Sequence, residues 1–170
     1  MCRIYAFVAI LFFVSFVSAE PQSDKVTQKL VGAWHLVAIE GKSPTIPMEL
    51  DHPTGLIVYT SSGWMSVQYS SSRDRKPFPK GLAAATIAEK AAAFDSYVAY
   101  YGTFKVDIAT QTITHRLEDH NHPGRHGVDN VRWFEFQGNN RVVLIPREDG
   151  KGGVIDRKAA TYKLIWDRIQ

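Results

Sequence analysis

Apolar and polar residues alternate along most of the chain from residue 33 onward, in short runs that turn residues separate. A period of two places successive side chains on opposite faces, which is typical of β-strands with one buried face. We therefore expect eight strands, at residues 33–40, 55–61, 64–70, 99–108, 111–117, 129–137, 141–147 and 160–169. The pattern predicts an all-β domain.

Short turns between consecutive runs predict hairpins. The turns are Ser62 with Gly63, Ala109 with Thr110, and the Gly-Asn-Asn segment at 138–140. Pairing the last strand with the first removes both open edges of such a sheet and closes it into an up-and-down antiparallel barrel. A two-sheet sandwich is the alternative, but the hairpin order favours the barrel. With eight strands, the interior is filled by side chains or holds one small ligand.

One segment departs from the alternation. Residues 81–98 are rich in alanine, with larger apolar residues at Leu82, Ile87, Phe94 and Val98. Alanine has the highest intrinsic helix propensity. The sequence therefore predicts one helix, inserted between the third and fourth strands, which could cover or plug one end of the barrel.

Residues 1–19 have the pattern of a secretory signal peptide. Arg3 precedes an apolar run at 4–17, and small residues end the segment at Ala19. The run is shorter than the roughly 20 residues that a membrane-spanning helix needs, and no later segment approaches that length. We expect cleavage after Ala19, which leaves residues 20–170 as one secreted or periplasmic barrel domain without a stable membrane span.

Composition narrows the possible functions. The single cysteine, Cys2, lies in the signal segment, so the mature chain would have no disulfide, no thiolate nucleophile and no cysteine metal ligand. The net charge is only +3, and basic residues are scattered except at 73–80. Nucleic-acid-binding proteins usually concentrate their basic residues on one face, so we expect no nucleic-acid partner. No sequence motif indicates a bound cofactor, so we expect none.

Gly32, Ala33 and Trp34 are similar to the Gly-x-Trp signature of lipocalins, and Arg168 lies on the last strand. Together with residues 53–68, 99–107, 112–115, 127–136 and 141–146, they resemble the bacterial and fungal lipocalin-like domain family. The resemblance runs from about residue 30 to residue 168. It implies a barrel with a ligand-sized interior, closed where Arg168 packs over Trp34 in a cation–π contact.

The chain departs from true lipocalins because it has neither their disulfides nor a second lipocalin motif. The family resemblance implies small-molecule carriers, and some lipocalin-like barrels act as cyclases or isomerases. Fold alone does not specify one activity.

Strand alternation assigns side chains to the barrel interior. His115 shares a face with Ile113 and Leu117, so we expect it to point inward. The expected ligand-binding residues are Trp34, Tyr100, Phe104, His115, Arg132, Phe134 and Trp166, with Leu36, Met65, Val67 and Leu144 as further lining. Mostly apolar walls with a few polar groups are typical of small-molecule pockets.

Two interpretations of His115 and Arg132 remain open. They contact a ligand directly, or they only make hydrogen bonds that hold the core. A catalytic version uses His115 as a general acid or base, with Arg132 or Tyr100 stabilising an enolate-like oxygen. There is no nucleophile elbow, phosphate loop or HExxH motif. Binding of a small, mostly apolar molecule is therefore favoured over a cyclase or isomerase activity, and a filled, structural barrel is the third possibility.

The stretch 114–127 contains four histidines. We expect His120, His122 and His126 in the connection between the fifth and sixth strands, where His120 and His122 could chelate a metal and His126 or Asp119 could complete the site. Their spacing matches no standard metal motif, so we expect a polar loop at the barrel mouth rather than a bound metal. Histidine titrates near pH 6.5, so acidification could charge this loop and alter ligand entry.

Two further loops have a possible role. Residues 40–55 could form a lid, and the basic residues 70–80 could attract an anionic ligand or a membrane surface. The alternative for both is a solvated surface connection.

Overall fold

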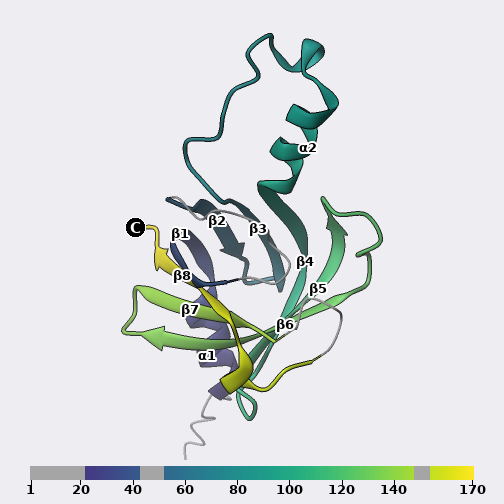
Figure 1. Cartoon of the computed structure of the whole chain (residues 1–170). Coiled ribbons are helices and arrows are strands. Elements are labelled where there is room, and N and C mark those ends of the chain that lie inside the picture. The colour runs from purple at the N-terminus through teal and green to yellow at the C-terminus, as the bar shows by residue number, and fades with distance from the viewer. Residues whose placement is uncertain (1–21, 43–51, 148–153) are drawn as a thin grey trace, which may run out of the picture.

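The structure is a computed structural model that describes residues 22–42, 52–147 and 154–170. Its main body is a closed antiparallel barrel in which each strand pairs with the next along the chain and β8 pairs with β1 (Figure 1). The strands are β1 (Gly32–Gly41), β2 (Thr54–Tyr59), β3 (Trp64–Ser70), β4 (Tyr97–Asp107), β5 (Thr112–His120), β6 (Asp129–Gln137), β7 (Arg141–Pro146) and β8 (Tyr162–Arg168). The predicted eight-stranded up-and-down barrel is confirmed.

The barrel closes between its first and last strands. Trp34 of β1 lies opposite Arg168 of β8, and the register continues to Gly41 opposite Tyr162. A β-bulge between Leu36 and Ala38 interrupts this ladder. Bulges bend and twist a strand, which helps a sheet to close on itself.

The inserted helix is shorter than predicted. Helix α2 covers Ile87–Asp95, a separate 3₁₀ turn covers Leu82–Ala84, and β4 already begins at Tyr97. The prediction of one helix over 81–98 was therefore wrong at both ends. A capping box starts α2, because the Thr86 side chain accepts from the Glu89 amide while Glu89 accepts from the Thr86 amide.

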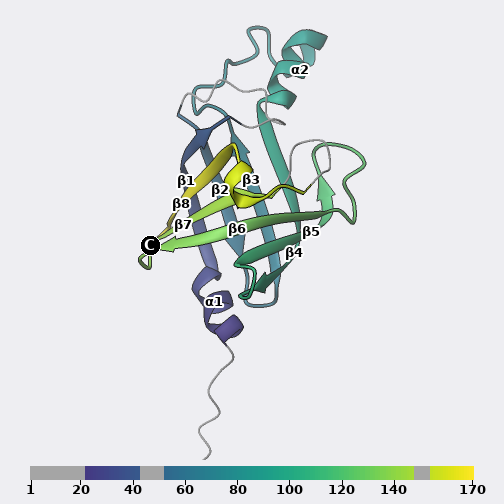
Figure 2. The same ribbon diagram turned by 60° about the horizontal axis from the view of Figure 1, so that its bottom comes forward.

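A second helix was not predicted. Helix α1 covers Gln22–Leu30, and Figure 2 shows it at the opposite end of the barrel from α2. Its sequence is mostly polar, but Leu30 is buried and the Leu30 carbonyl accepts a hydrogen bond from Trp34 Nε1 at 2.8 Å. Val26 and Leu30, four residues apart on one side of the helix, pack against the barrel core and stabilise α1. Within the described residues, no helix is long and apolar enough to cross a bilayer.

The up-and-down order places the loops at two ends. Residues 60–63, 108–111 and 138–140 lie at the end near α1, whereas residues 71–96 and 121–128 lie at the other end. We call this second end the open end. The predicted signal peptide and most of the predicted lid loop, at 43–51, lie outside the described residues.

Inward-facing side chains of all eight strands form one hydrophobic core. Trp34, Leu36, Ile113 and Val142 are fully buried. Polar groups among these apolar walls are few, so each of them needs a hydrogen-bond partner or a ligand.

Candidate ligand-binding site

A histidine lies between two tyrosines inside the barrel. His115 of β5 is fully buried; its Nε2 lies 2.9 Å from the Tyr59 hydroxyl and its Nδ1 lies 3.1 Å from the Tyr100 hydroxyl. A neutral imidazole has one N–H donor and one acceptor nitrogen. One tyrosine therefore donates to the ring and the other accepts from it.

Burial keeps this cluster uncharged. Desolvation, and then the charge of Arg132, lower the pKa of His115 well below its usual 6.5. Desolvation also raises the pKa of Tyr59 well above 10, with a smaller opposing effect of Arg132. Burial disfavours the charged form of either group, which explains the two opposite directions. At neutral pH the cluster is a hydrogen-bonded chain without net charge.

Arg132 brings a positive charge to the same interior. Its side chain is only 8 % exposed, and its guanidinium carbon lies 6.0 Å from the centre of the Tyr100 ring. Beside His115 on β6, buried Asn130 accepts a hydrogen bond from Arg125 at 2.5 Å. The charges that face this part of the interior are therefore basic.

His120 was expected in a loop but is the last residue of β5. Its ring stacks on Tyr100, with centres 5.4 Å apart and an interplanar angle of 6°. Its Nδ1 accepts from the His122 amide at 2.8 Å. Burial first, and then His122, Arg125 and Arg132, lower the pKa of His120 to about 4.

Strand β5 continues past its predicted end at Leu117, and its pairing with β4 contains a bulge there. Gly102 of β4 pairs with Leu117, but Tyr101 pairs with Asp119, so Glu118 is the additional residue. Beyond this bulge, the alternation of inward and outward side chains in β5 is reversed. The His120 side chain therefore lies on the same face of the sheet as Tyr100.

Two of the three histidines lie together, since the ring centres of His120 and His122 are 4.8 Å apart. His122 contacts Phe94 of α2, with ring centres 5.3 Å apart, and His126 Nδ1 lies 2.7 Å from the Glu118 carbonyl oxygen. Among the described residues, no three His, Cys, Asp or Glu side chains are grouped to hold a metal ion.

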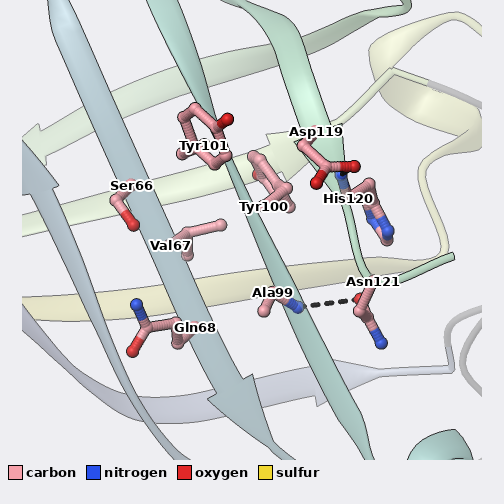
Figure 3. Close-up of a pocket in the computed structure, with 9 residues that line it drawn as sticks. All are labelled: Ser66, Val67, Gln68, Ala99, Tyr100, Tyr101, Asp119, His120 and Asn121. Atoms are coloured by element: carbon pink, nitrogen blue, oxygen red, sulfur yellow. Dashed lines mark hydrogen bonds between the residues drawn. The ribbon is translucent and has the colours of Figure 1, made fainter. Parts of the chain in front are cut away.

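A pocket of about 220 Å³ crosses β3, β4 and the end of β5 (Figure 3). Tyr100 and His120 connect it with the interior cluster, and the Asn121 side chain closes one side by accepting from the Ala99 amide at 2.9 Å. Its lining is Ser66, Val67, Gln68, Ala99, Tyr100, Tyr101, Asp119, His120 and Asn121. Its lining also includes outward-facing residues, among them Gln68, Tyr101 and Asp119.

The other expected ligand-binding residues lie inside the barrel in different surroundings. Trp34 lies near α1, where the guanidinium carbon of Arg168 is 4.0 Å from its ring centre. Phe104 packs edge-on against Tyr59 at 4.8 Å, and Phe134 is buried. Trp166 is 1 % exposed, and its indole Nε1 has no hydrogen-bond partner among the described residues.

Sequence reasoning missed Tyr59 as a partner of His115. Tyr59 ends β2 and shares its inward face with Ile57, and both residues are almost fully buried. The same alternation that selected His115 would have found it.

The eight strands form a closed barrel, with Trp34 at the end near α1 and a small polar cluster buried inside. These features define a lipocalin-like barrel. The chain belongs to the lipocalin-like domain family, whose family model matches residues 31–169. A search of curated proteins finds no match.

Among solved structures, the chain is similar to a redesigned β-barrel, with 8 % identity and a TM-score of 0.44 over 85 % of this chain and 95 % of that chain. It is also similar to a de novo designed fluorescence-activating β-barrel, with 9 % identity and a TM-score of 0.40 over 85 % and 97 %. For the siderocalin Ex-FABP, the identity is 12 % and the TM-score 0.33 over 83 % and 71 %.

Proposed function

We propose that the barrel binds a small, mostly apolar molecule that carries one anionic group. The observation that carries this proposal is Arg132, a nearly buried cation among apolar and aromatic walls. Its charge contributes to the pKa shifts of His115, Tyr59 and His120, so its field extends across this part of the interior. An anion placed there would be stabilised by that field, which low dielectric surroundings strengthen.

Trp166 supplies a second reason. A buried N–H without an acceptor costs free energy, so nearly all such groups in native proteins have a partner. A ligand oxygen near Trp166 Nε1 would satisfy this donor. Aromatic walls with a few buried donors suit a molecule that is apolar over most of its surface.

Binding is favoured over catalysis at His115. A general base must reach the proton that it removes. Both ring nitrogens of His115 already lie within hydrogen-bond distance of tyrosine hydroxyls. In this arrangement His115 orients Tyr59 and Tyr100 and leaves no nitrogen for a substrate.

Two fluorescent probes with related ring systems test the proposal. Anilinonaphthalene sulfonate is anionic, and N-phenylnaphthylamine is its neutral counterpart. We expect wild-type protein to bind both, and Arg132→Gln to weaken the anionic probe about tenfold while changing the neutral probe less than twofold. Arg116→Gln is the matched control, because Arg116 lies on β5 with its side chain 57 % exposed.

Three results would contradict the proposal. Wild-type protein could bind neither probe, which indicates a filled interior. Arg132→Gln could leave the preference for the anionic probe unchanged, or Arg116→Gln could reduce it equally. Urea unfolding of each variant checks that the barrel remains folded.

We further propose that the chain is exported and cleaved after Ala19. The basic residue, apolar run and small residues at 1–19 support this. N-terminal sequencing of protein recovered outside the cytoplasm should begin at Glu20. An intact N-terminus on all of the recovered protein would contradict the cleavage.

A further inference from the structure

The segment between β3 and β4 exposes apolar side chains that the barrel does not cover. Leu82 is 65 % exposed, Ile87 is 88 % exposed and Phe94 is 44 % exposed. Neither the 3₁₀ turn nor α2 contains a buried residue. Figure 1 shows this segment standing away from the barrel at one end. A helix normally buries its apolar residues against another surface.

Leu82 and Phe94 line a groove of about 300 Å³. Phe78, Leu82, Phe94 and Tyr97 supply its apolar lining, with Arg75, Lys90, Ala93 and Asn121 around them. Within α2, Ile87 and Phe94 are seven residues apart and therefore lie on one side of the helix. We call Phe78, Leu82, Ile87 and Phe94 with their neighbouring cations the α2 surface.

The charge of this surface is positive. Residues 73–95 contain Arg73, Arg75, Lys76, Lys80 and Lys90 against Asp74, Glu89 and Asp95. Glu89 is held by the Thr86 amide and hydroxyl at the start of α2. Lys76, Lys80 and Lys90 are all exposed. The surface thus combines exposed apolar side chains with exposed ammonium groups.

We propose that the α2 surface docks the protein on an anionic lipid bilayer. A short projection with apolar side chains can enter the headgroup region by about 5–10 Å while lysines remain at the phosphate level. Each lysine near an anionic leaflet adds electrostatic attraction. Charge complementarity favours this partner, because the lysines of the α2 surface are positive and the bilayer surface is negative. The bilayer can also accommodate scattered apolar side chains with lysines between them.

The docked orientation would turn the open end of the barrel toward lipid. Phe94 contacts His122. Of the groove residues, Tyr97 begins β4 and Asn121 directly follows His120 at the end of β5. An apolar ligand could then pass between the bilayer and the barrel without crossing water.

Flotation with lipid vesicles tests the docking. The protein is used as purified from producing cells, so that every variant has the same N-terminus. We expect binding to vesicles containing phosphatidylglycerol and little binding to pure phosphatidylcholine. Leu82→Ser with Ile87→Ser should weaken binding at least tenfold, and Lys90→Gln should weaken it about fivefold.

Matched controls lie elsewhere on the protein. Val154→Ser removes a side chain that is 73 % exposed in the β7–β8 connection, and Lys105→Gln removes an exposed lysine of β4. Both should bind vesicles as wild type does. Hydrogen exchange provides a local readout: amides of residues 82–95 should become protected when phosphatidylglycerol vesicles are added.

Other results would overturn the proposal. The serine double variant could bind vesicles as tightly as wild type does, or amides 82–95 could exchange equally fast with and without vesicles. Binding could be equal on both lipids. Concentration-dependent dimers that the same variants abolish, without any vesicle binding, would assign the surface to a second copy of the chain.

Discussion

Acidification from pH 7 to pH 5 should destabilise the barrel through His115. Its pKa in the folded protein lies well below 6.5, chiefly because of burial and secondarily because of Arg132. In the unfolded chain the same imidazole binds a proton near pH 6.5. The unfolded state therefore takes up a proton that the folded state excludes, so stability is complete above pH 6.5 and is lost as the pH falls below it.

The size of this loss of stability follows from the linkage between folding and proton binding. A histidine that cannot be protonated in the folded state lowers the free energy of unfolding by about 1.4 kcal/mol for each pH unit below its unfolded pKa. Between pH 7 and pH 5 this amounts to about 2 kcal/mol. His120, whose pKa falls to about 4, acts in the same direction. Because His120 is only partly buried, we assign it about 1 kcal/mol. Together they remove about 3 kcal/mol from a stability that is typically 5–15 kcal/mol.

Urea unfolding followed by circular dichroism measures this loss. With a urea dependence of about 2 kcal/mol per molar, the midpoint should fall by about 1.5 M between pH 7 and pH 5. His115→Gln will be less stable at pH 7, but its pH dependence should be smaller by about 2 kcal/mol. Tyr59→Phe is the matched control, because it removes one hydrogen bond of the cluster and keeps the buried imidazole.

One result would contradict the assignment of this pH dependence to His115. His115→Gln could show the same difference between pH 7 and pH 5 as wild type and Tyr59→Phe. Nuclear magnetic resonance gives an independent test, because the His115 ring signals should not titrate above pH 5. A midpoint near 6.5 would mean that the imidazole of His115 is open to water.

Three further predictions concern the fold. Arg168→Met should lower the free energy of unfolding by about 2 kcal/mol in urea titrations, since it removes the cation–π contact with Trp34. Gly102→Ala should cost about 3 kcal/mol by the same assay, because its Cβ would lie 1.9 Å from the Arg116 carbonyl oxygen. Thr86→Ala should speed amide exchange in α2 about fivefold through loss of the N-cap, with an unchanged urea midpoint because α2 buries no side chain.

The candidate site was only partly accessible to sequence reasoning. Alternation placed His115 on an inward face, since a strand within a barrel has one buried side. The prediction for His120 was wrong: it was expected in the connection after the fifth strand but ends β5, because pairing with Tyr101 and Tyr100 continues beyond the extra residue Glu118. The local sequence around Glu118 does not predict this bulge, because the bulge depends on pairing with Gly102 of the neighbouring strand.

The barrel follows from the sequence, because period-two alternation and short turns leave few other ways to cover the edges of eight strands. Three features required the folded structure. Tyr59 and Tyr100 enclose His115, α1 folds against Trp34, and α2 projects with its apolar side chains uncovered. These features depend on contacts between residues far apart along the chain, and local propensity carries no information about such contacts.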